Sequence, residues 1–499
     1  MLRLDDLLYG SAVSTTEFYA KHWERSPLHV SQRDGDFAAT AARRARIFTL
    51  SDLESVLLSE EDGADTGTQR GDRGDVAATH SLLLQNGMRV GGAFSVAYLA
   101  GASIVTNRAD LSAPRLAQIC LELGRDLAYV FAVSYLTPPA GAQAVPPHSD
   151  DQDVFVVQTH GRKQWRVWPP IVALPYSDEM VGKRGAAPLN ADDELGAPLL
   201  SVELQPGDVL YIPRGFVHDA FSVGDAPSLH VTLTVPTHDL TRGRALANAV
   251  ERALRLDPRA RHALPLARVA RSRGRVTSTE VLSDKSEGGG ESSSSADKAL
   301  AEELKAILTD ALARVFAGSG GEAAGAMLAA TSERLFGPRA AQEAVAARGR
   351  SHAAGDDDAE VDRAIHRDAV SGSRARLRVV RGMRIELGSV EASSAAAGAS
   401  GVGASAGAAA AAAAAPTAAM VVRRGDSSLH MRVGESDLPM LAAVAEHVHG
   451  RSGSGGGGDD GDGTFSVDDL PGRDSFAKMC IVHMLLDKGV LERSRVEAV

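Results

Sequence analysis

The stretch PPHSDDQDVFVVQTHGRKQWRVWPP, residues 146–170, constrains the fold of this 499-residue chain more than any other. After His148, Asp150 and Asp151, apolar and polar residues alternate with the period of a half-buried β-strand. The residues HGRK interrupt this alternation and predict a hairpin turn. Because ionisable side chains are costly to bury unless they are paired, the stretch predicts a β-hairpin with a polar site at its entrance.

The same period-two pattern recurs from about residue 129 to residue 236. Its segments, broken by glycine and proline, read AYVFAVSYLTPP, DVFVVQT, KQWRVWPP, SVELQPGDVLYIPRGFVHDAF and SLHVTLTV. Many short strands separated by close turns predict a sandwich or barrel rather than a parallel sheet. With helical patterns on both sides, the chain is predicted to be an α+β protein.

Capped apolar patterns predict helices within residues 1–58, where 49–58 forms one of them, and over 115–128. Residues 240–256 and 296–316 are amphipathic. The second of these carries one apolar stripe, which packs on its own core or on a second subunit. The stripe consists of Leu300, Leu304, Ile307, Leu308, Leu312 and Val315. The last 35 residues read as a short helix, a longer helix and an apolar turn, similar to a small winged-helix unit.

Four segments hold too few bulky apolar residues to anchor a core, and we expect them to be disordered or flexible. They are residues 60–75, 283–297, 391–419 and 450–463, the third being rich in alanine and glycine. Between them we expect structured parts at 95–238, 239–390 and 420–499, and a helical N-terminal part at 1–94 that contains the insert 60–75.

The formal net charge of −11 disfavours nucleic acid as a partner on average. Residues 258–276 are a local exception, rich in arginine and without an acid; they read as a solvated helix or linker, or as a docking strip for an acidic partner or RNA. Neither a membrane span nor a secretory signal is expected. Cys120 and Cys480 lie in apolar helical patterns, which predicts buried thiols in a reducing compartment, the cytosol or the nucleus.

His148 and Asp150 are two residues apart, so a strand would point both to one side and Ser149 to the other. His218, at the start of a strand in GDVLYIPRGFVHDAF, is the best candidate for a third ligand. Two histidines and one carboxylate form the facial triad of non-haem Fe(II) oxygenases. Zinc accepts the same donors in some hydrolases, usually in another spacing and with a separate general base, so iron is favoured.

Structural roles are favoured for the other polar residues near this site. Asp151 would point away from Asp150, which fits a charge at the hairpin edge or a hydrogen bond to a neighbouring loop. His230 reads as a histidine of a strand core, and His160 as a solvated turn residue.

An Fe(II) oxygenase that uses 2-oxoglutarate must hold the far carboxylate of that cosubstrate with a buried cation or with hydroxyl groups. Lys163, just after the hairpin turn, shares a strand face with Trp165 and Val167 and is the candidate cation. A surface lysine is the alternative. Tyr135 is the candidate hydroxyl partner, and a core tyrosine is the competing interpretation.

Six segments in this order resemble the JmjC-type ribosomal oxygenases, known in eukaryotes as bifunctional histidyl-hydroxylases and lysine-specific demethylases. They read FYAKHWERSPLHV, GASIVTN, SYLTPP, PPHSDDQDVFVVQTHGRKQWRVWPP, PGDVLYIPRGFVHDAFS and SLHVTLTV. The likeness spans about 15–58 and 95–236, and it departs at Val133, where the family often has asparagine. It implies a double-stranded β-helix (jelly-roll or cupin-type) JmjC core at 95–238, a helical dimerisation region at 239–390 and a winged-helix-like domain at 420–499.

The resemblance also implies iron ligands at His148, Asp150 and His218, and 2-oxoglutarate contacts at Lys163 and Tyr135. The expected activity is an Fe(II)- and 2-oxoglutarate-dependent dioxygenase that uses O₂ to hydroxylate a histidine or arginine of a ribosomal protein. A histone lysine demethylase acting in chromatin and transcription regulation is the alternative, and a non-catalytic cupin-like scaffold is a third. A homodimer in the nucleus or nucleolus, or else the cytoplasm, is expected, without sequence-specific nucleic-acid binding.

Overall fold

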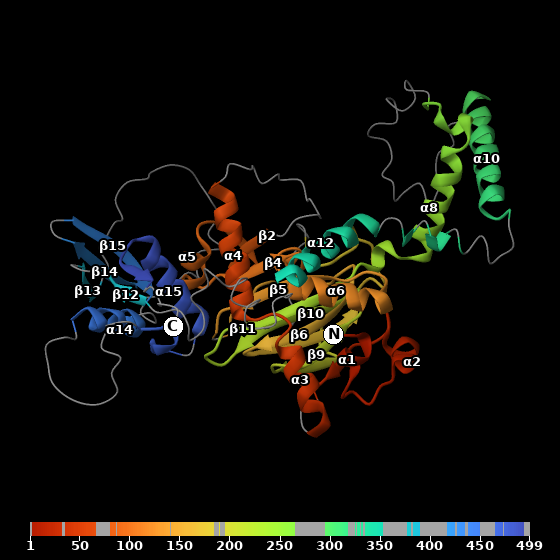
Figure 1. The fold of residues 1–499 in the computed structure, drawn as a ribbon. Coiled ribbons are helices and arrows are strands. Elements are labelled where there is room, and N and C mark those ends of the chain that lie inside the picture. The colour runs from red at the N-terminus through yellow and green to blue at the C-terminus, as the bar shows by residue number, and fades with distance from the viewer. Residues whose placement is uncertain are drawn as a thin grey trace. The chain divides into compact units, whose positions relative to one another are not determined.

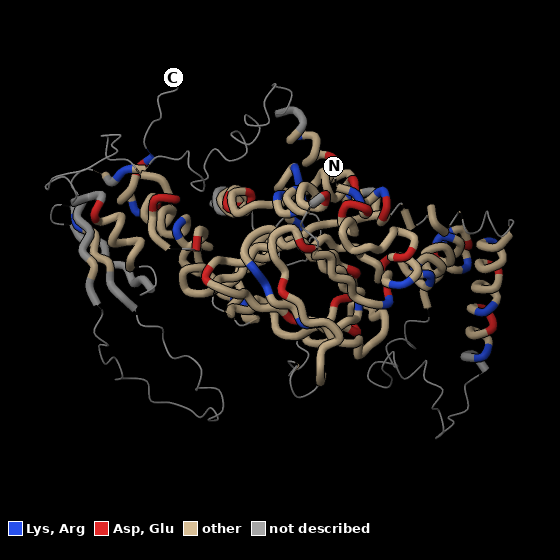
Figure 2. The backbone as a smooth tube through the Cα atoms, turned by 90° about the horizontal axis from the view of Figure 1, so that it is seen from below, with Lys and Arg blue, Asp and Glu red and all other residues tan. Residues whose placement is uncertain are grey.

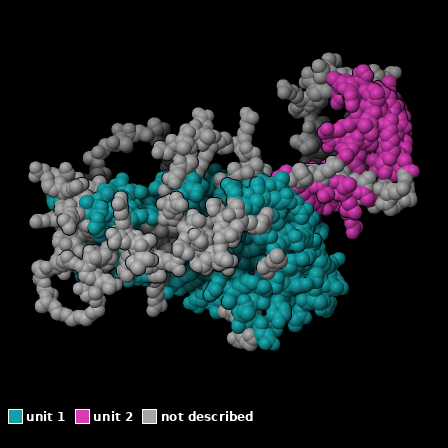
Figure 3. All heavy atoms as spheres, viewed as in Figure 1, with its two compact units in different colours: residues 1–238, 338–499 teal, residues 239–337 magenta. Residues whose placement is uncertain are grey.

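The protein is described by a computed structural model that divides into two compact units, residues 1–238 with 338–499 and residues 239–337 (Figure 3). The residues that the structure describes are 2–31, 35–65, 80–85, 87–139, 141–183, 189, 195–264, 295–317 and, with short breaks, 325–352, 377–389, 417–449 and 465–493.

Antiparallel β-strands form the core of the first unit (Figure 1). These strands are β1 (Leu28–Val30), β2 (His80–Gln85), β3 (Met88–Val90), β4 (Ser103–Asn107), β5 (Phe131–Thr137), β6 (Asp153–His160), β7 (Arg162–Pro170), β8 (Leu200–Leu204), β9 (Val209–Ile212), β10 (Phe216–Val223) and β11 (Ser228–Val235). In the described residues, one sheet has the order β1-β9-β6-β11-β5-β4-β2-β3 and a second has the order β10-β7-β8. Two antiparallel sheets agree with the predicted α+β class and are consistent with the cupin-type core that the resemblance implies.

The apolar core lies between the two sheets, where alternate residues of β6 and β7 point toward each other. Val154 and Val156 of β6 pack with Trp165 and Val167 of β7. The cluster is completed by Leu204, Leu210, Ile212, Phe216 and Ala220. These are the apolar positions of the alternating pattern, so burial of this face is the physical reason for the period-two sequence.

The opposite face of β6 is covered by the N-terminal helices. These are α1 (Leu4–Leu8), α2 (Thr15–Glu17) and the π-helical turn η1 (Phe18–His22). Phe18 lies 5.7 Å from Phe155 and 4.9 Å from Tyr211, measured between ring centroids. Phe155 and Tyr211 are themselves fully buried, so β6 and β9 have apolar contacts on both faces.

The prediction that residues 1–94 are helical is wrong in part, because β1, β2 and β3 belong to the large sheet. Strand β1 pairs with β9 and strand β2 with β4, and pairing between distant segments overrides local propensity. The remaining helices up to residue 127 are α3 (Ala38–Ala45), α4 (Leu50–Asp65), α5 (Phe94–Leu99) and α6 (Pro114–Leu127). Helix α4 includes the first residues of the insert predicted at 60–75; residues 66–75 lie outside the described part.

The chain beyond residue 337 also belongs to the first unit. Its elements are α12 (Phe336–His352, which begins at the end of the second unit), β12 (Leu377–Val379), β13 (Met383–Ser389), β14 (Thr417–Arg424), β15 (Ser427–Gly434), α14 (Leu438–His449), α15 (Ser475–Asp487) and β16 (Leu491–Arg493). The sheet β13-β14-β15 and the pair β12-β16 are antiparallel. Helix α15 is largely buried, and its Phe476 lies 4.8 Å from Tyr98 of α5.

These elements change the boundaries predicted from the sequence. The region 239–390 is not helical throughout, because it ends in β12 and β13, and α12 packs on α6 through Ala117, Val345 and Ala346. The alanine-rich segment 391–419 ends inside β14, and its residues before 417 lie outside the described part, as do 283–294 and 450–463. The winged-helix interpretation of 420–499 stays a prediction.

The second unit is built on α8 (Arg242–Arg255), the short helix η5 (Pro258–Arg261) and α10 (Ser295–Val315). Ile307 of the predicted apolar stripe is buried, whereas Leu304 and Leu308 are 46% and 47% exposed. Acidic and basic residues follow one another along these helices (Figure 2). In the arginine-rich strip, Arg259 pairs with Asp257 and Asp310, and residues 265–276 lie outside the described part.

Two further predictions concern the character of the chain. Cys120 and Cys480 are both buried free thiols, as their apolar surroundings predicted. Within the ranges that the structure describes, we find no helix that combines the length and the apolar character needed to cross a membrane.

Candidate metal centre

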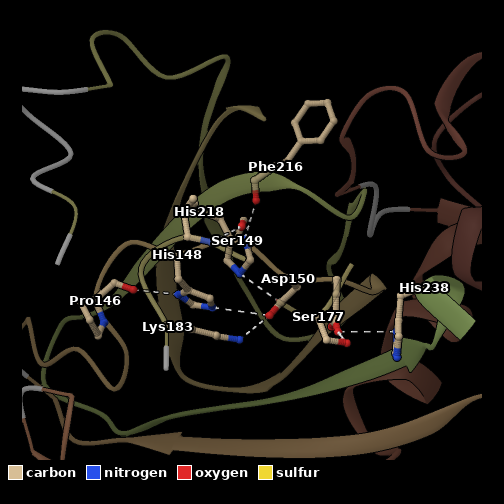
Figure 4. Close-up of polar contacts among 11 residues, drawn as sticks. Pro146, His148, Ser149, Asp150, Ser177, Lys183, Phe216, His218 and His238 are labelled. Atoms are coloured by element: carbon tan, nitrogen blue, oxygen red, sulfur yellow. Dashed lines mark hydrogen bonds and ion pairs between the residues drawn. The ribbon is translucent and has the colours of Figure 1, made fainter. Parts of the chain in front are cut away.

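The side chains of His148, Asp150 and His218 meet at one point of the barrel (Figure 4). One ligand atom from each lies within 4.8 Å of the other two. The Nε2 atom of His218 is 3.6 Å from Oδ2 of Asp150, and Nε2 of His148 is 4.0 Å from Oδ1. Because bonds from such donors to a metal are about 2 Å long, one ion fits among them. The structure therefore brings the three predicted ligands together.

The backbone achieves this differently from the prediction. Residues 148–150 do not form a regular strand, since β6 begins only at Asp153. Instead, His148 and His218 form an isolated antiparallel bridge: each backbone N–H donates to the other residue's carbonyl, at 3.1 and 2.9 Å. The N–H of Gly215 donates to the carbonyl of Asp150 at 2.8 Å. Gly215 has a φ of +88°, which glycine adopts without strain.

Both imidazoles are oriented by backbone carbonyls. Nδ1 of His148 is 2.7 Å from the carbonyl oxygen of Pro146, and Nδ1 of His218 is 3.1 Å from that of Phe216. A carbonyl only accepts, so Nδ1 donates and the lone pair of Nε2 faces Asp150. Burial lowers the pKa of both histidines, which keeps the imidazoles neutral and able to bind a metal.

Asp150 is held as a carboxylate by its neighbours. Burial would raise its pKa, but the ammonium of Lys183 lowers it below the usual range. The Nζ of Lys183 donates to Oδ1 of Asp150. Two neutral histidines and one carboxylate are donors that suit Fe(II). Lys183 was missed by sequence reasoning because it lies in the loop between β7 and β8, with no pattern that relates it to the triad.

A pocket next to the triad is walled by side chains of β5, β6, β7, β10 and β11. Lys163 lies in this wall and is only 2% exposed, which rules out the surface alternative. Its Nζ donates to Oγ1 of Thr137 at 2.8 Å, and burial lowers its pKa to about 7. The structure thus provides a buried cation in the same pocket as the triad.

Tyr135 also lines this pocket, stacked on His230 with ring centroids 4.8 Å apart and planes at 4°. His230 meets Trp165 edge-on at 5.3 Å and is buried in β11, as predicted for a strand core. It also faces the pocket, which sequence reasoning did not assign to it. Val133 packs in a separate apolar cluster with Val105 and Ala144, so its side chain offers no polar contact.

The remaining polar residues take structural roles. Asp151 accepts a hydrogen bond from Ser177 and lies 3.7 Å from Nδ1 of His238, so it bonds to a neighbouring loop, as one alternative predicted. His160 is the last residue of β6 and is partly buried, which corrects its assignment to a solvated turn. Gly161 alone makes the turn between β6 and β7, but these strands lie in different sheets and do not pair with each other, so the predicted β-hairpin is wrong. The turn carries the chain from one sheet to the other, because β6 pairs with β9 and β11 and β7 pairs with β8 and β10.

Comparison with known proteins agrees with this geometry. Residues 107–241 match the model of the JmjC domain. The bifunctional lysine-specific demethylase and histidyl-hydroxylase NO66 of Culex quinquefasciatus is 31% identical over 228 residues, which cover 45% of this chain and 33% of that protein. Ribosomal oxygenase 1 of Gallus gallus is 34% identical over 223 residues, or 44% of this chain and 34% of that protein. The match thus spans about a third of these relatives' length.

Among solved structures, the ribosomal oxygenase YcfD from Escherichia coli, in complex with cobalt and 2-oxoglutarate, aligns over 98% of this chain and 100% of that chain. The TM-score is 0.37 and the identity 13%. The domain match and the curated relatives are the stronger findings. Residues 107–241 are therefore similar to the JmjC domain, and the chain is similar over less than half of its length to NO66 and to ribosomal oxygenase 1.

Proposed function

We propose that this chain is an Fe(II)- and 2-oxoglutarate-dependent dioxygenase that hydroxylates a protein. The observation that carries the proposal is the meeting of His148, Asp150 and His218 at a pocket whose wall holds the buried ammonium of Lys163. A facial triad suits iron, and a buried cation suits the far carboxylate of the cosubstrate.

When bound, Fe(II) together with 2-oxoglutarate supplies the activation of O₂ for hydroxylation of a C–H bond. His148, Asp150 and His218 would hold the ion from one side, with their Nε2 atoms and carboxylate already aimed at it. Lys163 would pair with the cosubstrate's far carboxylate while keeping its bond to Thr137. Tyr135 and Trp165 wall the pocket and exclude water from it.

The substrate we favour is a histidine or arginine side chain of a ribosomal protein. Support comes from the names of the relatives, which are ribosomal oxygenases and histidyl-hydroxylases. Hydroxylation of a side-chain carbon would give a stable alcohol. We further propose a homodimer formed through α10, because its Leu304 and Leu308 are exposed. By analogy with the family, we propose residence in the nucleus or nucleolus.

Demethylation of histone lysine is the second candidate. The NO66 relatives carry this activity in their names. The chemistry at the metal would be unchanged, because hydroxylation of a methyl-lysine gives a hemiaminal that loses the carbon as formaldehyde.

The deciding experiment is mass spectrometry of ribosomal proteins and methylated histone peptides incubated with the full chain, Fe(II), 2-oxoglutarate and O₂. Gain of one oxygen on a histidine or arginine supports the first function, and loss of a methyl group supports the second. Asp150→Ala abolishes either product. Asp151→Asn is the control and is expected to keep the activity. Its amide oxygen still accepts the hydrogen bond from Ser177, and this side chain is not a metal ligand. If no product and no succinate form, the chain is a non-catalytic scaffold.

A further inference from the structure

Lys183 places its ammonium on the carboxylate that would bind the metal (Figure 4). Its Nζ donates to Oδ1 of Asp150, the same oxygen that lies 4.0 Å from Nε2 of His148. The lysine side chain is 29% exposed, so it reaches the triad from the loop between β7 and β8 with one side open to solvent. A cation of the protein itself thus lies on the carboxylate that a metal would need.

The loop that carries Lys183 is hydrogen-bonded to the segment that carries the ligands. The N–H of Ser149 donates to the carbonyl of Val181 at 3.1 Å, and the N–H of Val181 donates to Oγ of Ser149 at 3.1 Å. Ser149 stands between the ligands His148 and Asp150. This reciprocal pair sets the distance between the lysine's backbone and the triad.

Gly182 allows this close approach. Its φ is +70°, and a Cβ at this position would lie 2.2 Å from the carbonyl oxygen of Pro147 and 2.9 Å from Cα of His148. Only glycine brings the two backbones so near. On the preceding residue, the side chain of Val181 packs against Trp168 and Val217. The position of Lys183 is therefore defined by apolar packing and backbone contact as well as by its ion pair.

The electrostatic effects agree with this geometry. After burial, the ammonium of Lys183 is the strongest influence that lowers the pKa of His148, ahead of the imidazole of His218. It also acts on Asp150 and on His218. An ammonium this near the triad and a divalent metal ion would repel each other strongly.

We propose that Lys183 competes with the metal ion for Asp150, so that metal loading requires the ammonium to leave the carboxylate. This inference deepens the proposed function and rests on it. The lysine would neutralise Asp150 while metal is scarce and would set the metal concentration at which the site loads. An opposite role, in which Lys183 supports Asp150 as a ligand from behind, predicts the opposite effect of removing it.

The test is a titration of the full chain with Co²⁺ alone, followed by visible absorption and by competition with a chelator. Lys183→Met, which keeps the chain length and removes the charge, is expected to bind Co²⁺ at least about tenfold more tightly than the unmodified chain. Lys183→Arg keeps a cation at Asp150 and is expected to bind no more tightly. Lys21→Met is the matched control, because Lys21 is an exposed lysine paired with Glu17, and its Co²⁺ affinity stays unchanged.

The possible outcomes separate the two proposals. If the unmodified chain binds Co²⁺ and Asp150→Ala does not, the metal site stands; equal or weaker binding by Lys183→Met then overturns the competition alone. If neither the unmodified chain nor Lys183→Met binds Co²⁺, the metal site itself is wrong and the competition falls with it.

A second measurement needs no variant at Lys183. Acetylation by an amine-specific reagent, read at Lys183 by mass spectrometry, is expected to rise severalfold when Co²⁺ is added, because the displaced ammonium becomes accessible. In Asp150→Ala the addition of Co²⁺ is expected to change nothing. Unchanged labelling of the unmodified chain under saturating Co²⁺ would contradict the proposal.

Discussion

Lys163 is a buried lysine, and burial disfavours the charged form of its side chain. Burial lowers its pKa to about 7, so the ammonium is present below neutral pH and is lost as the pH rises. We therefore expect the affinity for 2-oxoglutarate to fall above about pH 7, because the cation for the far carboxylate disappears. Calorimetric dissociation constants between pH 6 and pH 9 measure this.

Lys163→Arg is the control for this pH dependence. A guanidinium stays protonated over the whole range, so the affinity of the variant for 2-oxoglutarate is expected to vary little with pH. The same pH dependence in both proteins would show that another group is responsible.

Asp153 is a second buried residue whose charged form is disfavoured by its surroundings. Burial raises its pKa to about 6, although Thr237 and Tyr211 donate hydrogen bonds to it. Because the folded state holds the proton more tightly than the unfolded chain, this residue's contribution to stability is complete below about pH 4 and is lost as the pH rises through about 6.

Asp153→Asn removes the group that ionises, so the variant does not lose this stability as the pH rises. The amide keeps an oxygen that accepts hydrogen bonds. The free energy of unfolding of the variant, relative to the unmodified chain, is expected to increase by about 2–3 kcal/mol between pH 4 and pH 7. Urea unfolding at both pH values gives this difference, in which other titrating groups cancel. A difference that is independent of pH would refute the assignment.

At the scale of elements, the turn that connects β6 in one sheet to β7 in the other depends on one glycine. Gly161 has a φ of +62°, and a Cβ there would lie 2.0 Å from the carbonyl oxygen of Pro227, a backbone atom. Gly161→Ala is therefore expected to lower the free energy of unfolding by more than about 2 kcal/mol, measured by denaturant titration.

Gly224→Ala is the matched control for Gly161→Ala. Gly224 has a similar φ of +85°, but its Cβ would meet only the end of the Arg162 side chain, at 3.1 Å. The arginine can move away, so the expected loss is limited to the left-handed backbone, about 1–2 kcal/mol. Equal losses in the two variants would mean that the contact with Pro227 relaxes without cost.

At the scale of the first unit, helices from opposite ends of the sequence are joined by a buried polar pair. Nε2 of His483 in α15 lies 2.7 Å from Oε1 of Glu54 in α4, and both side chains are buried. On the same helix α15, Phe476 packs on Tyr98, whose hydroxyl donates to Asp474 at 2.9 Å. The C-terminal part thus shares a core with the N-terminal part.

His483→Ala removes the donor from a buried carboxylate and is expected to cost about 2–3 kcal/mol of stability, read by thermal or urea unfolding. His483→Gln retains a donor at similar reach, so its cost is expected to be smaller. If glutamine is as destabilising as alanine, the packing of the ring against Phe94, rather than its hydrogen bond, is what matters.

The residues of the site were largely predictable from the sequence, because their signals are local. The alternation that predicts β7 arises from burial of one strand face, and it placed Lys163 in the buried wall where the structure has it. Strand β6 is buried on both faces, which its nearly continuous apolar run DVFVV reflects. The donor types of His148, Asp150 and His218 limit the metal to iron or zinc and favour iron, and residue types are known from the sequence. Helices α4 and α10 were likewise visible as capped, periodic segments.

The tertiary structure decided the contacts between segments that lie far apart in the chain. No periodic pattern in the local sequence predicts such contacts. The isolated bridge of His148 with His218, the sheet pairing of β1, the pair of Glu54 with His483 and the approach of Lys183 to Asp150 are all of this kind. Periodicity reports which face of an element is buried, whereas the partner on that face depends on how the whole chain closes.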